Sequence, residues 1–148
     1  MGTKRQVLTD RRGVPLSVVI GAANRNDMKV AEATLDEIIV ERPTPTVVSP
    51  QHLCRDKGFD YPETDRAAEA RGYTLHTARK RKRGQPPPAL LPADPQHPAR
   101  RWVVERTNSW HHRFRTLRVR FEKTAANYRG LVQLACLFIV YRLRLILG

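Results

Sequence analysis

A basic and proline-rich segment, residues 79–98, most constrains what this chain can fold into. It reads RKRKRGQPPPALLPADPQHP. Its prolines remove backbone donors and its neighbouring cations repel one another, so it cannot pack as regular structure. A loop of this length is uncommon inside a compact domain. We therefore expect a linker at 79–98 that separates two differently patterned parts of the chain, residues 1–78 and residues 99–148.

Residues 1–78 alternate between strand-like and helix-like sequence. The first two strand-like segments flank the turn sequence DRRG, which predicts a β-hairpin. Asp27 stands where a helix N-cap is expected, and Pro62 stands where a further helix can begin. The expected strands are 4–9, 14–20, 52–55 and 73–77, and the expected helices are 28–40 and 63–71. This order predicts an α/β fold, more narrowly an α+β mixed sheet covered by helices.

Residues 99–148 are helical in composition. One apolar face, at about 100° per residue, predicts a helix that runs to about residue 123; its members are Val103, Trp110, Phe114, Leu117 and Phe121. A second helix is expected from about 124 to 147. Its apolar run at 131–141 is shorter than the roughly 20 residues that cross a bilayer, and Arg142 and Arg144 follow it. We expect a buried core helix here and no membrane partner.

The charge of the chain indicates what it binds. The 148 residues include 27 Lys and Arg against 14 Asp and Glu, which gives a formal net charge of +13. Such a charge bears on partners rather than on fold, and nucleic acid is the commonest partner, with an anionic membrane surface as the alternative. Cys54 and Cys136 are too far apart for a metal-binding pattern and indicate reduced thiols.

Two acids stand out by position. Asp56 follows a predicted short strand, and Gly58 allows the backbone to turn there. Glu105 lies in the first turns of a predicted helix. Carboxylates of this kind can hold a pair of Mg²⁺ ions that act on phosphodiesters. The alternatives are a turn Asp that caps the next segment and a surface Glu paired with Arg101 or His112. On a helical wheel, Glu105 lies roughly 150° from the centre of the apolar face.

Three stretches carry a resemblance to a known family. GTKRQVLTDRRGVPLSVVIGAANRNDM, residues 2–28, looks like the second and third strands of DDE-type insertion-sequence transposases, in the group named after the fifth bacterial insertion sequence. CRDKGFD, residues 54–60, resembles that group's D-K-G-Y-D motif. RWVVERTNSW, residues 101–110, resembles its R-x-x-V-E-R-x-x-x-W motif. The resemblance covers almost the whole chain, with the motifs in the same order and spacing.

This resemblance implies a fold and an activity. The family has an RNase H-like core, a five-stranded mixed sheet flanked by helices. Its members hydrolyse DNA at transposon ends, and the freed 3′-hydroxyl then attacks target DNA. Mg²⁺ is held by Asp, Asp and Glu. Carried over by position, Asp56 is the second acid and Glu105 the third, so both are expected to be catalytic residues and metal ligands.

The first acid of the family is a departure. Its strand would lie upstream of residue 4, so we expect this chain to lack it. Asp10 lies in the hairpin turn and Asp27 beyond the second strand, so neither replaces it. We expect a partial RNase H-like fold without its first central strand, a gap between the hairpin and the Asp56 strand, and a loosely folded isolated protein. The chain then represents the C-terminal catalytic part of a transposase, either truncated or the second of two reading frames.

Cations around the two acids are expected to contact DNA phosphates, although they could also be solvated charge around a core stripe. Arg106, Arg113 and Arg120 repeat every seventh residue and would form a ridge along one helix. His111 and His112 are expected at the surface. The expected DNA-binding residues are Lys57, Arg101, Arg106, Arg113, Arg115, Arg118, Arg120 and Lys123.

Three functions compete at this stage. The first is a DDE transposase that acts on transposon ends and target DNA with Mg²⁺, although this chain alone is expected to be inactive. The second is a non-catalytic DNA-binding fragment that regulates transposition. The third is a small basic structural protein of the ribosome or nucleoid. For the transposase we expect a homo-oligomer or a partner from an upstream frame, in the bacterial cytoplasm near the nucleoid.

Overall fold

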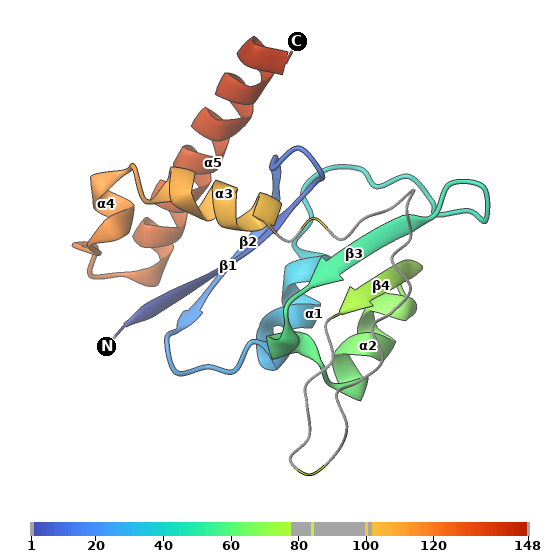
Figure 1. The fold of residues 1–148 in the computed structure, drawn as a ribbon. Coiled ribbons are helices and arrows are strands. Elements are labelled where there is room, and N and C mark those ends of the chain that lie inside the picture. The colour runs from blue at the N-terminus through green and yellow to red at the C-terminus, as the bar shows by residue number, and fades with distance from the viewer. Residues whose placement is uncertain (1, 78–83, 85–99, 101, 148) are drawn as a thin grey trace.

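The computed structural model describes residues 2–77, 84, 100 and 102–147, without the side chains of the last two. The linker expected at 79–98 lies outside the described residues, apart from Gly84. The elements on either side of it form a mixed α/β structure, as expected (Figure 1).

The N-terminal strands β1 (Thr3–Thr9) and β2 (Pro15–Ala22) form the predicted antiparallel hairpin. Its turn is closed by the Asp10 carboxylate, whose Oδ1 accepts from the backbone N–H groups of Arg12 and Val14, both at 2.8 Å. Gly13 has a φ of 87°, a conformation that glycine adopts without steric cost. Local turn chemistry therefore fixes the hairpin, as its sequence predicted.

A second, parallel pair consists of β3 (Gln51–Arg55) and β4 (Tyr73–Thr77). The connection runs through the short 3₁₀ helix η1 (Lys57–Phe59) and through α2 (Pro62–Glu69), which begins at the predicted proline. Gly72, with a φ of 76°, ends this connection and leads into β4. The strand and helix expected here are confirmed to within about two residues.

Helix α1 (Met28–Asp36) packs against the hairpin and against α2. It is shorter than predicted, because the chain turns back toward β2, where the Ile39 N–H donates to the Leu16 carbonyl at 3.3 Å. Asp27 occupies the N-cap position of α1, as predicted, but its side chain does not cap the helix. Its backbone is already helical, its side chain makes no capping hydrogen bond, and its carboxylate pairs with Lys4 of β1 instead.

The prediction of a single helix that runs to about residue 123 is wrong. The structure has α3 (Trp102–His111) and a separate short helix, α4 (Arg115–Arg118), because Phe114 and Val119 have extended backbones. The break lets Leu117 reach the apolar core, and it frees the Leu117 carbonyl to accept from Arg5 Nη1 at 2.9 Å. A long-range contact thus overrides the helical pattern of the sequence.

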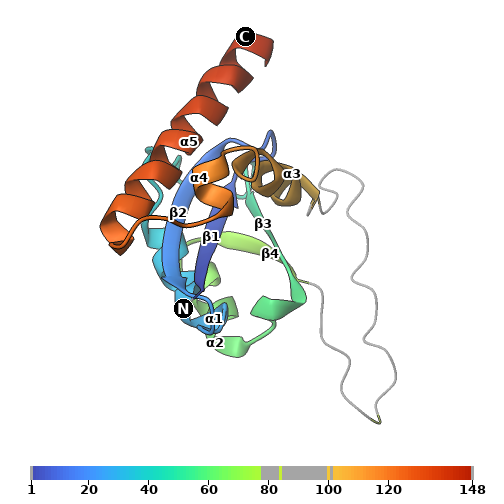
Figure 2. The same cartoon turned by 90° about the vertical axis from the view of Figure 1, so that its left-hand side faces the viewer.

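The last helix, α5 (Ala125–Leu147), is buried along only one stripe. Tyr128, Val132 and Ala135 join Leu117 in the main apolar cluster, which packs on β2. Leu137 and Leu145 are 63% and 67% exposed, so the expectation of a buried core helix fails for that face. The C-terminal part of α5 projects away from the rest of the fold in both views (Figures 1 and 2). Among the described helices, none is long and apolar enough to cross a membrane.

The strands form two separate two-stranded sheets rather than one. Within residues 2–77, no hydrogen-bonded pairing joins β1 to β3, although the two strands face each other (Figure 2). A cavity of about 540 Å³ lies between them, closed by α1 and α3. The expected gap between the hairpin and the Asp56 strand is confirmed, and we call this space the inter-sheet cavity.

Candidate active site and nucleic-acid interface

Asp56 lies directly after β3 and at the edge of the inter-sheet cavity. Its backbone is extended, and its carboxylate accepts from the Lys57 backbone N–H at 2.6 Å, which caps η1. The side chain is exposed to solvent. Asp56 therefore does act as a capping residue, at the end of a strand that borders the inter-sheet cavity.

Glu105 lies in the first turn of α3 and is exposed. The same helix lines the inter-sheet cavity through Val103, Val104 and Asn108, whereas Glu105 lies on the neighbouring solvent-facing side. This orientation agrees with the helical wheel, which placed Glu105 away from the apolar face. The structure thus brings Asp56 and the Glu105 helix to one cavity, but Glu105 itself is not part of the cavity lining.

The two carboxylates have the oxygen ligands that Mg²⁺ prefers, but they are one acid short of the Asp, Asp and Glu that the resemblance implied. Mg²⁺ takes oxygen ligands and keeps several waters, so one or two carboxylates are a normal protein contribution to one ion. Among the described residues, no group of three or more His, Cys, Asp or Glu side chains could hold a metal. The described residues therefore do not form the three-carboxylate site that the resemblance implied.

The cations expected at the DNA interface do not form one ridge. Arg106 lies on α3, Arg113 lies in the turn between α3 and α4, and Arg120 lies in the loop between α4 and α5. Because the chain bends twice over this stretch, the sevenfold spacing does not place the three residues on one helix face. The ridge prediction is therefore wrong. Of the other expected contacts, Arg101 lies outside the described residues, and Lys57, Arg113, Arg115, Arg118 and Lys123 are exposed.

Arg106 has a structural environment. Its guanidinium lies 4.9 Å from the ring centre of Trp102 and 5.0 Å from that of Trp110, between the two indoles. Nη2 also donates to the Arg12 carbonyl at 2.6 Å in the hairpin turn. Arg106 therefore connects α3 to the hairpin, which leaves less of its guanidinium for a phosphate.

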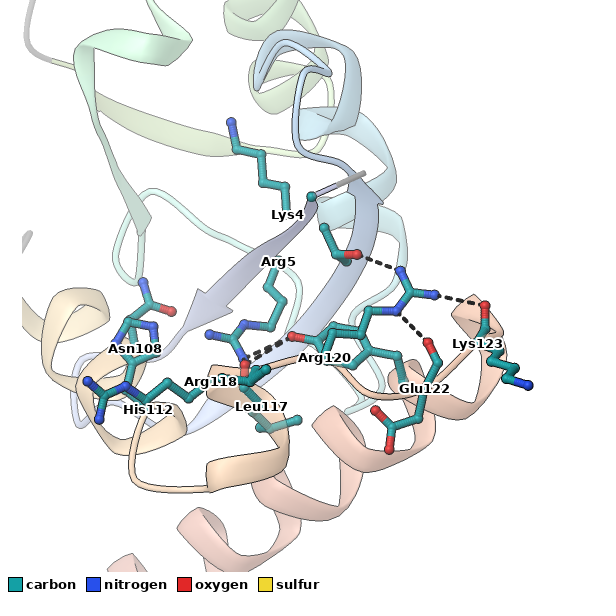
Figure 3. A pocket seen from close by; sticks show the side chains of 13 residues that line it. Lys4, Arg5, Asn108, His112, Leu117, Arg118, Arg120, Glu122 and Lys123 are labelled. Atoms are coloured by element: carbon teal, nitrogen blue, oxygen red, sulfur yellow. Dashed lines mark hydrogen bonds between the residues drawn. The ribbon is translucent and has the colours of Figure 1, made fainter.

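A basic hollow of about 960 Å³ opens between β1, α3 and the segment that joins α4 to α5 (Figure 3). Six basic side chains line it, together with one acid, Glu122: Lys4, Arg5, His112, Arg118, Arg120 and Lys123. The sequence did not indicate that Lys4, Arg5 and His112 belong to this interface. Lys4 and Arg5 lie more than 100 positions before the arginines that they join, and His112 was expected only to be a surface residue. The lining of the hollow is therefore strongly basic, with a single carboxylate among its side chains.

Two arginines of the basic hollow are engaged in holding the fold together. Arg5 donates to the Leu117 carbonyl at 2.9 Å and to the Tyr128 hydroxyl at 3.2 Å. Arg120 donates to the Thr3 hydroxyl of β1 at 2.5 Å and to the Glu122 carbonyl at 2.9 Å (Figure 3). Arg118 and Lys123 are exposed at the rim of the hollow. The rim cations are therefore better placed than the inner arginines to contact phosphates.

His111 of α3 and Cys136 of α5 form a side-chain pair, in which His111 is buried and Cys136 is partly buried. His111 is fully buried, so its predicted surface position is wrong, whereas His112 is exposed as expected. His111 Nε2 lies 3.3 Å from Cys136 Sγ. Burial, with Arg5 and His112 nearby, lowers the pKa of His111 to about 4, and burial raises the pKa of Cys136 to about 11. Both groups are neutral at pH 7, which fits a packing role.

Comparison with known proteins agrees with these features. A family model described as "Transposase DDE domain" matches residues 1–140. A curated protein of Burkholderia cepacia, named as the candidate transposase for insertion sequence element IS402, is 31% identical over 146 residues. The match covers 95% of this chain and 63% of the relative, so the chain spans less than two thirds of the relative's length. No solved structure matches.

Proposed function

The chain belongs to the transposase DDE domain family, and on that premise we propose that it is the catalytic part of an insertion-sequence transposase. It would cleave DNA at transposon ends and join the freed 3′-hydroxyl to target DNA. Its fold would be an RNase H-like core without one central strand. The observation that carries the proposal is the shared cavity: Asp56 at the end of β3 and the helix of Glu105 meet there.

Asp56 and Glu105 would hold Mg²⁺ in this function. Bound Mg²⁺ would stabilise the negative charge that develops on the phosphodiester and its leaving oxygen. Lys57, directly after Asp56 and exposed, would contact a neighbouring phosphate. A further carboxylate is needed for a second ion, and we propose that it comes from polypeptide outside this chain.

The exposed rim of the basic hollow would bind the DNA backbone. Arg118 and Lys123 lie at this rim, and Arg113 and Arg115 are exposed on the adjoining turn and helix. Contacts of this kind position DNA without reading its sequence, and they weaken steeply as salt is raised. The substrate would therefore be held by phosphates, and the transposon end would be recognised elsewhere.

A second candidate is DNA binding without cleavage, as a regulatory fragment. It is favoured by the basic hollow, which this chain forms by itself from β1 and residues 108–128. The candidate metal site, in contrast, has only two of the three acids that the resemblance implies for catalysis. Such a fragment would compete for transposon ends or join longer subunits as a homo-oligomer or a partner of an upstream-frame product.

A strand-cleavage assay with Mg²⁺ separates the two candidates. It compares this chain with a chain extended at its N-terminus by a strand that bears an Asp. Cleavage by the extended chain alone supports the catalytic proposal and a missing third ligand. In the extended chain, Asp56→Asn keeps an oxygen acceptor for the Lys57 N–H but removes the negative charge. Glu105→Gln likewise removes the charge of the α3 carboxylate at nearly constant side-chain size. Each change should abolish cleavage.

Glu63→Gln is the matched control, because Glu63 is an exposed acid on α2 outside the cavity lining. Full cleavage by the Asp56→Asn and Glu105→Gln variants would show that the site is assigned to the wrong residues. Filter binding across a salt series tests the DNA surface in parallel. Arg118→Ala and Lys123→Ala should each reduce the salt slope by about one, whereas Arg66→Ala on α2 should not.

A further inference from the structure

Helix α5 is apolar on most of its circumference, although the fold covers only one side of it. Its buried stripe, which includes Tyr128, Val132 and Ala135, packs on the hairpin. The C-terminal part of the helix projects past the rest of the molecule (Figures 1 and 2). A helix that is apolar all round is normally buried all round. The uncovered side of α5 therefore has the composition of a helix that another element covers.

Four large apolar side chains form a second stripe on this uncovered side, and we call it the docking stripe: Leu134, Phe138, Tyr141 and Leu145. They are between 49% and 67% exposed. Their spacings are four, three and four residues, so at about 100° per residue they fall within an arc of about 60°, roughly 130° from the buried stripe. This is the a and d spacing by which one helix packs along another. Contiguous exposed apolar surface of this kind marks an interaction site.

Two exposed arginines flank the docking stripe. On the same helical wheel, Arg142 and Arg144 lie about 80° to either side of its centre. In a helix pair, the flanking positions face charged residues of the partner. No Asp or Glu occurs in residues 123–148, so α5 has no acid of its own to balance these cations. The charges therefore indicate a partner with acidic flanking positions.

A membrane surface and a second copy of the chain match this surface less well. A helix that lies in a membrane interface has a strongly polar face opposite its apolar one. Helix α5 instead has its buried apolar stripe there, packed on the protein. A second copy would bring the same acid-free helix and a further formal charge of +13, so Arg142 and Arg144 would meet cations rather than carboxylates.

We propose that the docking stripe binds an acidic amphipathic helix of a different polypeptide. That helix presents apolar residues at its a and d positions and carboxylates at the flanking positions, which pair with Arg142 and Arg144. The stripe is about 17 Å long at about 1.5 Å per residue, so roughly three helical turns of the partner cover it. The inference goes beyond the proposed function, since it requires neither DNA nor Mg²⁺.

A designed peptide is the probe for this surface. It has three heptads, roughly 21 residues, with Leu at a and d and Glu at e and g, and the like charges keep it from pairing with itself. A scrambled peptide of the same composition controls for general attraction to a basic chain, and a peptide with Lys in place of Glu controls for charge. Fluorescence anisotropy with the full chain should show at least tenfold tighter binding of the acidic helix than of either control. Equal binding of the scrambled peptide would overturn the proposal.

Two changes on α5 test whether the docking stripe is the binding site. Tyr141→Ser combined with Leu145→Ser removes exposed apolar surface and should weaken binding of the acidic helix at least tenfold, whereas Val47→Ser, at an exposed apolar residue before β3, should not. Arg144→Glu should weaken the acidic peptide at least fivefold and strengthen the Lys peptide. Arg66→Glu, at an exposed arginine of α2, should do neither.

Sedimentation of the chain alone and flotation with phosphatidylcholine–phosphatidylserine vesicles test the other two occupants. Self-association that the Tyr141→Ser and Leu145→Ser double variant abolishes would assign the stripe to a second copy. Vesicle binding that the same variant abolishes would assign it to a membrane, and either result overturns the proposal. If circular dichroism shows that the double variant is unfolded, the reversed peptide preference of Arg144→Glu decides the question, and an unchanged preference overturns the proposal.

Discussion

The two strand pairs of this molecule have different kinds of interior. The β3–β4 pair is built around a buried arginine, Arg55, which donates to Thr77 Oγ1 and to the Thr64 carbonyl, both at 2.9 Å, and pairs with Asp65. The β1–β2 hairpin instead packs on the apolar cluster around Leu117 and Val132. The inter-sheet cavity lies where the two interiors meet, so each strand pair depends mainly on its own core.

This difference predicts different responses to mutation. A buried charged network fails when one partner is removed, because the remaining groups keep their desolvation cost without compensation. An apolar cluster loses stability in proportion to the volume that is removed. The earlier expectation of a loosely folded protein can therefore be stated by region: the two strand pairs should unfold in separate steps rather than together.

The largest effect is expected for Arg55→Ala. The change removes the buried guanidinium that donates to Thr77 and to the Thr64 carbonyl and pairs with Asp65, and the loss of such a partner costs about 3–5 kcal/mol. Hydrogen exchange should accelerate in β3 and β4 and much less in β1 and β2. Arg66→Ala is the control, because Arg66 is exposed and its pairing with Glu63 spans 3.9 Å. Equal acceleration in both strand pairs would contradict separate cores.

Leu117→Ala should affect the other region. Leu117 is 3% exposed in the apolar cluster, and truncation of a buried leucine costs about 2–5 kcal/mol. Urea denaturation followed by exchange should show the loss in the hairpin and α5. Leu134→Ala, at an exposed site of α5, should change stability by about 0.5 kcal/mol or less. A similar loss in both variants would mean that the α5 stripe is assigned incorrectly.

The buried His111 should make the hairpin region sensitive to acid. Its pKa is lowered to about 4 from an unfolded value of 6.5, so the unfolded chain binds a proton between these values that the folded chain excludes. Stability is therefore complete above pH 6.5 and falls as the pH is lowered toward 4, by at most about 3 kcal/mol.

Urea titrations at pH 7.5 and 5.5 measure this loss. Arg5, His112 and Cys136 face or adjoin the imidazole, and the thiol stays protonated over this range because burial raises its pKa to about 11. His111→Gln should remove much of the difference between the two pH values. His112→Gln, at the adjacent exposed position, should retain it. A pH dependence that is unchanged by His111→Gln would assign the acid sensitivity to the carboxylates.

The same contrast explains which parts of the fold the sequence predicted. The hairpin turn and the α2 start depend on Asp10, Gly13 and Pro62, whose effects are local, and both were predicted. The end of α3 depends on no glycine or proline. The separate helix that follows is contacted by Arg5, which donates to the Leu117 carbonyl 112 positions away in sequence, and no local pattern reveals such a contact.

The candidate site divides in the same way. Asp56 was placed correctly at a strand end, because the strand and Gly58 mark that turn in the sequence. The basic hollow was only half predicted, since β1 supplies Lys4 and Arg5 to arginines more than 100 positions later. The catalytic roles of Asp56 and Glu105 rest on the family resemblance and stay predictions until cleavage is measured.

The smallest expected effects concern α1, which is tied to both regions by ion pairs. Arg71, after α2, pairs with Asp36 of α1 at 2.7 Å, and Arg129 of α5 pairs with Glu37 at the end of α1. These side chains are partly exposed, so Arg71→Ala and Arg129→Ala should each cost about 1 kcal/mol or less.

Their regional consequences should nevertheless be opposite. Arg71→Ala should loosen β3 and β4 while the hairpin keeps its protection, and Arg129→Ala should loosen α5 while β3 and β4 keep theirs. Because the two pairs share no residue, the double variant should show the sum of the two losses within about 0.5 kcal/mol. A larger combined loss would mean that α1 transmits stability between the two strand pairs, and the molecule would then behave as one cooperative unit despite its divided sheet.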